Sequence, residues 1–256
     1  MLTIAACIKF VRSELLSGNQ QSSNAYTLNP YDLLVLEQLL ALKKTHACRV
    51  IGVTMGPKGC LESAQRFIAM GLDDIYIIND PCFAGSDTYS TSYILSKALA
   101  HVGQADIYTF GEKAIDGETS QVPIGVASFL DVLCYTGVEK IELHDDDTVN
   151  LRCLRMDRIE IIETPYPIAI CFRGFTTKEP DISLLQLKRS RNHLPVILDA
   201  ASFQVDRQYC GQSGSKTKVV QITNIINKRD AEPIDGSLSN KTDVLNKLIL
   251  TGGLHT

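Results

Sequence analysis

A regular alternation of short apolar runs with longer segments of helical periodicity constrains the fold of this chain more than any other feature. The apolar runs span residues 2–8, 50–54, 75–78 and 106–110. Each run is too short for a buried helix and is rich in strand-forming residues, as is typical of strands buried on both faces. Strands that alternate with helices predict a mostly parallel sheet covered by helices on both faces.

Helix signals occupy the segments between these runs. Asn29, Pro30 and Asp32 together predict a helix start, with Asn29 as the N-cap, Pro30 at the first helical position and Asp32 facing the positive helix end. The later helices are expected at about residues 61–70, 90–101 and 121–130.

The pattern changes after Leu130. Strand-like runs at 138–143, 149–154 and 158–162 predict a small antiparallel hairpin or meander, with a turn at Asp145–Asp147. Residues 168–172 then return as a buried strand.

The C-terminal part is rich in Gly, Ser, Asn and Lys and cannot bury itself alone. It contains one strand-like piece at 218–222 and an amphipathic helix near 243–250. We therefore expect a nucleotide-binding α/β domain over residues 1–200, and an extended C-terminal arm with a helix over residues 201–256 that packs on a partner subunit.

Charge and composition exclude several classes of protein. A formal net charge of −4 leaves no basic field for nucleic acid. No apolar run approaches the roughly 18 residues of a membrane span, and no basic segment precedes the first apolar run, so a cytoplasmic protein is expected. The eight cysteines form no CxxC pair, which favours reduced, buried thiols and predicts no metal site.

The candidate ligand site lies just beyond the carboxyl ends of the strands, as in other open α/β sheets. Three segments reach that edge, residues 7–12, 54–59 and 111–122. The third combines small residues, hydroxyls and a helix start, and its backbone N–H groups suit a phosphate while Asp116 and Glu118 suit a ribose or an adenine amine. A capped helix with a solvated acidic turn explains the same residues equally well.

Catalytic motifs are missing from this sequence. It has no GxGxxG after the first strand, no GK[ST] phosphate loop, no GxSxG elbow and no cysteine with a nearby histidine. The sequence thus predicts a nucleotide pocket without a catalytic acid, base or nucleophile.

Several motifs together resemble the β subunit of electron-transfer flavoproteins. They follow the family order over about the first 130 residues: Lys9-Phe10-Val11, Asn29-Pro30-Tyr31-Asp32, Met55-Gly56-Pro57, Ala69-Met70-Gly71-Leu72-Asp73 and Ala114 to Val122. Glu179-Pro180 and the helix after it resemble the segment by which that family recognises its partner.

The resemblance implies a Rossmann-like fold of the adenine-nucleotide-binding type, and a heterodimer with an α subunit that carries an FAD. The two subunits together pass electrons between flavin dehydrogenases and an acceptor. The β-subunit pocket holds AMP in some members, and a second FAD reduced by NADH in the electron-bifurcating ones. Carried over by position, the nucleotide contacts are Cys7, Lys9, Val11, Asn29, Pro30, Tyr31, Asp32, Met55, Gly56, Gly111, Glu112, Lys113, Ala114, Ile115, Asp116, Gly117, Glu118, Thr119, Ser120, Gln121 and Val122.

Residues 83–92 resemble a segment of the bifurcating, anaerobe-type members, which favours FAD and places Asp87, Thr88 and Thr91 near the flavin nucleotide or NADH. The resemblance then implies a flavin-dependent dehydrogenase or reductase as one partner and a low-potential acceptor such as ferredoxin as another. In the recognition segment Glu179, Pro180, Leu184 and Leu185 are the expected partner contacts.

The sequence departs from the family at four places. Arg12 and Ser120 stand where the family has a proline and a small residue. Pro123-Ile124 replaces a common Gly-Pro, and Asp181-Ile182 replaces the usual Arg-Tyr of the recognition segment. The alternatives to a bifurcating subunit are a carrier with structural AMP and a stand-alone adenine-nucleotide-binding regulator. A hydrolase or ligase that uses ATP is disfavoured, because this sequence has no phosphate-loop lysine and no catalytic constellation.

Overall fold

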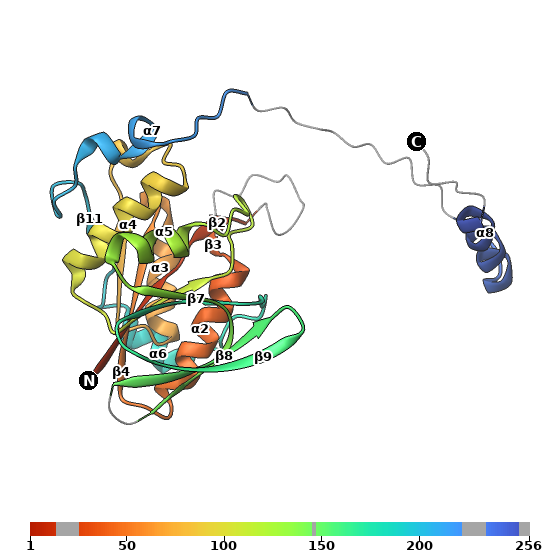
Figure 1. Cartoon of the computed structure of the whole chain (residues 1–256), viewed down its shortest axis with the longest axis horizontal. Coiled ribbons are helices and arrows are strands. Elements are labelled where there is room, and N and C mark those ends of the chain that lie inside the picture. The colour runs from red at the N-terminus through yellow and green to blue at the C-terminus, as the bar shows by residue number, and fades with distance from the viewer. Residues whose placement is uncertain (14–25, 145–146, 222–233, 251–256) are drawn as a thin grey trace. The chain divides into compact units, whose positions relative to one another are not determined.

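The computed structural model describes residues 1–13, 26–144, 147–221 and 234–250 (Figure 1). The chain divides into two compact units, Met1–Lys218 and Val219–Thr256. The first unit contains the sheet and its covering helices, and the described part of the second contains one helix, α8 (Leu238–Leu250).

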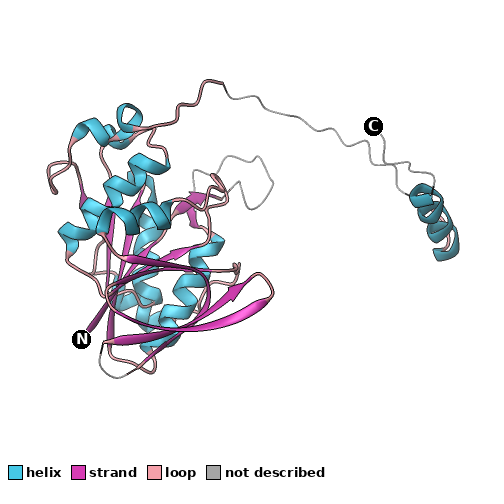
Figure 2. Ribbon diagram, viewed as in Figure 1, coloured by secondary structure: helices cyan, strands magenta, loops and turns pink. Residues whose placement is uncertain are grey.

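The first unit is built on one nine-stranded sheet (Figure 2). Its strand order is β11-β5-β4-β1-β6-β10-β7-β8-β9, and every neighbouring pair is parallel except β7–β8 and β8–β9. The strands are β1 (Leu2–Cys7), β4 (Cys48–Met55), β5 (Asp74–Ile78), β6 (Ile107–Gly111), β7 (Leu133–Leu143), β8 (Thr148–Arg155), β9 (Arg158–Pro165), β10 (Ile168–Phe172) and β11 (Val196–Leu198). The predicted mostly parallel sheet with a small antiparallel part is confirmed.

Helices cover both faces of this sheet, as the alternation predicts. One core lies under α2 (Pro30–Lys43) and α3 (Leu61–Met70), and the other lies under α4 (Thr88–Val102) and α5 (Val122–Leu130). The alternating side chains of β1 divide between them, since Ile4 enters the first core and Ala5 the second. The short α6 (Leu184–Ser190) packs against α3.

Three strands were not expected from the sequence. β2 (Phe10–Arg12) and β3 (Tyr26–Leu28) form a separate two-stranded antiparallel sheet, so the predicted loop over residues 12–27 is wrong at both of its ends. The interior of that loop, 14–25, lies outside the described residues. The edge strand β11 was missed too, because a three-residue strand is too short to show a period.

The C-terminal predictions had mixed outcomes. The expected strand at 218–222 is wrong over Lys218–Gln221, where the chain is not in a strand, and Ile222 lies outside the described residues. A run of strand-forming residues makes no ladder unless a neighbouring strand pairs with it. The predicted terminal helix is confirmed as α8, which starts five residues earlier than expected. Asp145 and Asp146 of the predicted turn are outside the described residues.

The eight cysteines are all free thiols, and six of them are buried. No helix within the described ranges is long and apolar enough to cross a membrane.

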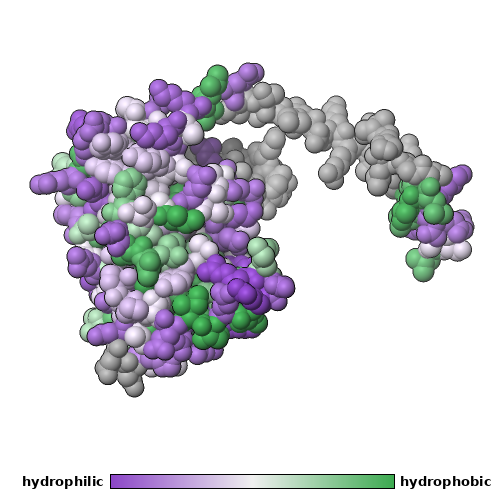
Figure 3. Space-filling model, viewed as in Figure 1, coloured by the Kyte–Doolittle hydropathy of each residue, from purple (hydrophilic) through white to green (hydrophobic). Residues whose placement is uncertain are grey.

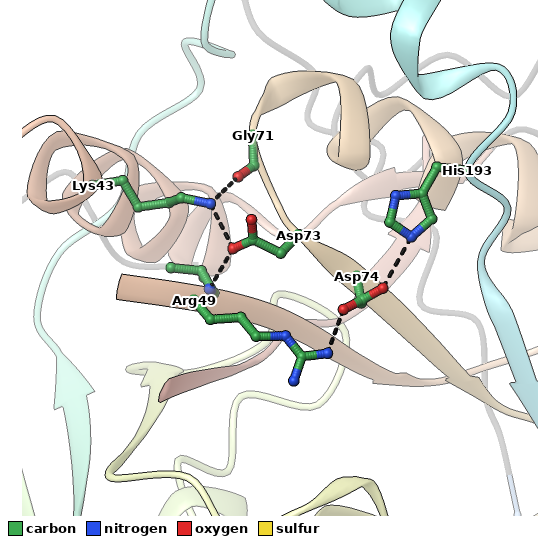
Figure 4. A network of polar contacts seen from close by, with 7 residues as sticks. Lys43, Arg49, Gly71, Asp73, Asp74 and His193 are labelled. Carbon is green, nitrogen blue, oxygen red and sulfur yellow. Dashed lines mark hydrogen bonds and ion pairs between the residues drawn. The ribbon is translucent and has the colours of Figure 1, made fainter. Parts of the chain in front are cut away.

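A network of ion pairs joins the helices to the amino ends of β4 and β5 (Figure 4). Lys43 at the end of α2 donates to the Gly71 carbonyl (2.9 Å) and pairs with Asp73. Asp74 at the start of β5 accepts from Arg49 and contacts His193 Nε2 at 2.9 Å. This network lies at the opposite end of the strands from the predicted ligand site.

Candidate functional site

A cavity of about 440 Å³ lies at the carboxyl ends of β1, β4 and β6. It is the place where the strand order reverses, because β4 lies on one side of β1 and β6 on the other. Open α/β sheets bind ligands at such a switch point, and small-molecule sites typically occupy about 300–1,000 Å³. The cavity therefore has the position and the size of a ligand site.

Most of the residues predicted to contact a nucleotide line this one cavity. They are Cys7, Lys9, Asn29, Asp32, Met55, Asp87, Thr88, Thr91, Gly111, Lys113, Ala114, Gly117, Glu118, Thr119, Ser120, Gln121 and Val122. All three segments selected at the strand ends contribute to the lining, as does the start of α4.

Seven of the predicted contacts do not line the cavity: Val11, Pro30, Tyr31, Gly56, Glu112, Ile115 and Asp116. Their contacts show why. Val11 is buried in β2, the Tyr31 ring packs on Phe175, and Glu112 turns away to accept from the Gly174 N–H at 3.3 Å. A role for these residues toward a ligand stays a prediction.

The carboxylate of Asp32 is the centre of the site. It is buried on the first turn of α2, where Oδ2 accepts from the Lys9 N–H (2.8 Å) and from Asn29 Nδ2 (3.0 Å), and Oδ1 accepts from the Gly111 N–H (3.1 Å). Lys9 follows β1 and Gly111 ends β6, so one side chain ties together two strand ends and a helix. Asp32 thus shapes the floor of the cavity.

Asn29 takes the N-cap position of α2, and Pro30 the first helical position, as predicted, but the Asn29 side chain makes no capping hydrogen bond. Its amide instead donates to the Lys113 carbonyl (2.8 Å) and accepts from the Ile115 N–H (3.2 Å), more than 80 residues along the chain. The amide finds its partners in these distant backbone groups, and the interaction holds the Gly111–Val122 loop against α2.

Burial dominates the electrostatics of the cavity floor. It raises the pKa of Asp32 to about 7, even though the hydrogen bonds from Asn29, Lys9 and Gly111 lower it. Burial also raises the pKa of the Cys7 thiol far above its ordinary range, with the Asp32 charge adding to the effect. A buried thiol with a raised pKa stays protonated and is a poor nucleophile.

Two ion pairs lie along the rim of the cavity. Lys9 Nζ contacts Asp116 at 2.7 Å, and Lys113 Nζ contacts Glu118 at 3.1 Å. Both lysines line the cavity and supply the positive charge that a phosphate needs.

The loop between the rim and α5 has an unusual backbone. Glu118 and Ser120 both have positive φ angles, 50° and 54°, in a region that residues other than glycine rarely adopt. Such strain costs on the order of 1 kcal/mol for each residue and concentrates at ligand-binding loops. The predicted ligand loop therefore carries a structural mark of a binding segment.

The start of α4 forms the wall of the cavity opposite this loop. Asp87 caps the helix by accepting from the Ser90 N–H at 3.0 Å, so that α4 begins at Thr88, two residues before the predicted start. Thr88 Oγ1 reaches across to Gln121 Oε1 at 2.9 Å, joining the two walls.

Sequence reasoning missed eight lining residues: Ile8, Val53, Phe83, Gly85, Ser86, Leu95, Phe110 and Pro123. Most are apolar residues of strands and helices, which sequence alone does not separate from core residues. Phe83, Gly85 and Ser86 lie inside the 83–92 segment, and Ile8 lies inside the 7–12 segment, both of which the sequence analysis selected.

The four predicted partner contacts lie outside the cavity lining. Glu179 pairs with Arg66 of α3 at 2.7 Å. Leu184 and Leu185 are exposed at the start of α6, which a reciprocal capping box between Ser183 and Gln186 stabilises.

Comparison with known proteins gives consistent matches. The electron transfer flavoprotein domain matches residues 20–182. The electron transfer flavoprotein subunit beta of Thermoanaerobacterium thermosaccharolyticum is 34% identical over 216 residues, covering 82% of this chain and 81% of the relative. Protein FixA of Azorhizobium caulinodans is 33% identical, with 76% and 72% covered, and the caffeyl-CoA reductase-Etf complex subunit CarD of Acetobacterium woodii is 29% identical, with 84% and 82% covered.

Proposed function

Because this chain belongs to the electron transfer flavoprotein family and is similar to its β subunits, we propose that it is the nucleotide-binding β subunit of a heterodimer. The α subunit of that heterodimer carries an FAD. The cavity at the strand ends binds a second nucleotide, and the pair transfers electrons between a flavin-dependent dehydrogenase or reductase and a further acceptor.

The cavity supports an adenine nucleotide by its donor set. Lys9 and Lys113 offer positive charge to a phosphate, and Thr119, Ser120 and Gln121 add side-chain hydrogen-bonding groups beside the start of α5. The acidic Glu118 suits a ribose hydroxyl or the adenine amine. We propose these residues, with Asn29 and Asp32 holding them in place, as the binding site.

We propose FAD as the nucleotide, with NADH as its electron donor and with bifurcation to a dehydrogenase or reductase and a low-potential acceptor such as ferredoxin. The observation that carries this choice is the extent of the cavity, which continues from the Gly111–Val122 loop to Gly85, Asp87 and Thr91 at the start of α4. FAD supplies the redox chemistry, and this chain binds and orients it. A carrier with structural AMP is the second candidate, since the loop segments alone suffice for AMP.

Exposed leucines at the start of α6 support assembly with a partner protein. Leu184 and Leu185 are 87% and 57% exposed on α6, and we propose them, with Glu179 and Pro180, as contacts to the dehydrogenase or reductase. The relative CarD is by name a subunit of a reductase complex, which agrees with this role.

We also propose that the arm predicted over residues 201–256 packs on the α subunit through its part from Val219 on, since Phe203 and Cys210 are buried in the core of the first unit. In its terminal helix α8, Leu245, Leu248 and Ile249 are exposed, and Figure 3 shows apolar side chains on this helix. A surface of this kind in an amphipathic helix is typical of a docking element.

The test is to co-express the chain with its α subunit, purify the complex and count the nucleotides extracted for each heterodimer. Two FAD molecules per heterodimer support the bifurcating role. One FAD together with one AMP supports the simple carrier, and a stable flavin-free monomer supports the stand-alone regulator.

A further inference from the structure

The chain returns to the cavity wall after more than 100 residues. Residues Tyr209–Thr217, which we name the strap, lie against the segment that leads into α4. Its backbone contacts are close: the Gln212 N–H donates to the Ala84 carbonyl (3.1 Å), and the Gly211 N–H donates to Ser86 Oγ (3.2 Å). The strap supports the wall from outside the cavity.

Glycine makes this approach possible at one point of the strap. Gly211 has a φ of 59°, and a side chain there would collide with the carbonyl of Cys82. The strap and the wall therefore touch backbone to backbone, a geometry that leaves little freedom for either segment.

Asp87 is the residue at which the two segments join. Its Oδ1 caps α4, and its Oδ2 accepts from both the N–H (2.8 Å) and the hydroxyl (3.0 Å) of Thr217. Partial burial raises the pKa of Asp87, but the hydrogen bonds from Ser90 and Thr217 outweigh it and bring the pKa below its ordinary value, so the carboxylate is charged at neutral pH. Both oxygens are thus occupied by the protein itself, which fits a positioning role better than direct contact with a ligand.

Ser215 fastens the wall at a second point. Its buried hydroxyl accepts from the Asp87 N–H at 2.8 Å and lies within donating distance of the carbonyls of Gly85 (3.1 Å) and Gly211 (2.8 Å). Gly85 and Asp87 both line the cavity. The position of the wall therefore depends on Ser215 and Thr217, neither of which lines the cavity.

We propose that Ser215 and Thr217 are positioning residues which, through Asp87 and Gly85, fix the cavity wall that receives the part of a dinucleotide beyond its adenosine monophosphate. This inference rests on the proposed function, because it takes the Gly111–Val122 loop as the site for the adenosine monophosphate part. The strap ends next to Lys218, the last residue of the first unit, so it also connects the wall to the chain that continues into the proposed partner-binding arm.

The proposal predicts different effects on two probes, AMP and FAD. We would titrate each into the full-length chain by calorimetry, using the wild type, the double variant S215A/T217V and the conservative variant Thr217→Ser. The double variant should bind FAD about tenfold more weakly, which corresponds to about 1.4 kcal/mol, and AMP less than about threefold more weakly. Thr217→Ser keeps the hydroxyl and should bind both as the wild type does.

Ser213 supplies the matched control, because it is an exposed serine on the same strap and does not contact Asp87. Ser213→Ala should bind FAD and AMP with wild-type affinity. Near-ultraviolet circular dichroism of each variant checks the fold. If S215A/T217V misfolds, the single variant Thr217→Val, altered at an exposed residue, carries the test, with a loss of FAD affinity of about threefold expected.

The outcomes separate the two proposals. A wild-type chain that binds neither nucleotide overturns the proposed function and this inference with it. A wild-type chain that binds both, with equal losses or no loss in S215A/T217V, overturns the strap inference alone. Wild-type binding of AMP without FAD likewise overturns the strap inference while the AMP carrier stands.

Discussion

Asp32 and Asp74 lie at opposite ends of the parallel strands, and their surroundings give the same side chain different roles. Asp32, at the carboxyl ends of the strands, is buried and accepts three hydrogen bonds from N–H groups, none of them from a charged side chain. Asp74, at the amino end of β5, is partly exposed and contacts Arg49 and His193 (Figure 4). Burial raises the pKa of Asp32 to about 7. It also raises that of Asp74, but the contacts from Arg49 and His193 bring the net value below the ordinary one.

The difference shows at which end of the strands the fold bears an energetic cost. At the amino end, opposite charges meet near solvent and each pair contributes little to stability. At the carboxyl end, the carboxyl group of Asp32 is buried and held in place by N–H groups of Lys9, Gly111 and Asn29, at a cost in desolvation. A buried carboxyl group with a strongly raised pKa at a cavity marks a candidate ligand site.

The largest expected effect comes from removing the buried carboxylate. Asp32→Ala should lower the free energy of unfolding by about 3 kcal/mol, because three buried donors lose their acceptor. Asp74→Ala should lower it by less than about 1 kcal/mol. Urea denaturation of both variants measures the contrast, and equal losses would contradict the distinction between the two ends.

The pH dependence of stability sharpens the comparison. The folded pKa of Asp32, about 7, lies above its ordinary value of 3.8. Between these two values the folded protein keeps a proton that the unfolded chain releases, so stability from this group falls as the pH rises. From pH 5 to pH 8 the wild type should lose about 3 kcal/mol that Asp32→Asn does not lose. Urea denaturation at each pH tests this, and parallel curves for the two proteins would refute it.

A backbone change beside Asp32 should have a smaller effect. A Cβ at Gly111 would lie 2.5 Å from Asp32 Oδ1 and 2.8 Å from the Tyr31 backbone, whereas a Cβ at Gly117 in the same loop would meet nothing within 4 Å. Gly111→Ala should therefore lower the free energy of unfolding by about 1.5 kcal/mol. Gly117→Ala should change it by less than about 0.5 kcal/mol. Thermal or urea denaturation of the two variants measures the difference. A larger loss in Gly117→Ala than in Gly111→Ala would show that the backbone around Gly111 adjusts freely to a side chain.

The smallest effect is expected at the amino end. His193→Ala removes one partner of Asp74 while Arg49 remains, so the free energy of unfolding should fall by about 0.5 kcal/mol. The same denaturation assay measures it at pH 7. A loss above about 2 kcal/mol would mean that the ion-pair network at the amino end contributes as much to the free energy of unfolding as the hydrogen bonds of Asp32 do.

Much of the fold followed from local pattern alone. The runs at 2–8, 50–54, 75–78 and 106–110 are mostly apolar at successive positions, so both faces of each strand are apolar. Such strands are typical of a parallel sheet with helices on both faces. The chain order of strands and helices then placed the three ligand segments at one edge, because parallel strands end on the same side of a sheet.

Only the tertiary structure decided what the polar residues of that edge do. Asn29 pairs with the backbone at 113 and 115, and Asp87 pairs with Thr217, at separations of 84 to 130 residues. The short strands β2, β3 and β11 likewise exist only through their partners. Local pattern reports burial and helical or strand period, whereas the partner of a hydrogen-bonding side chain is set by whichever distant segment the folded chain brings beside it.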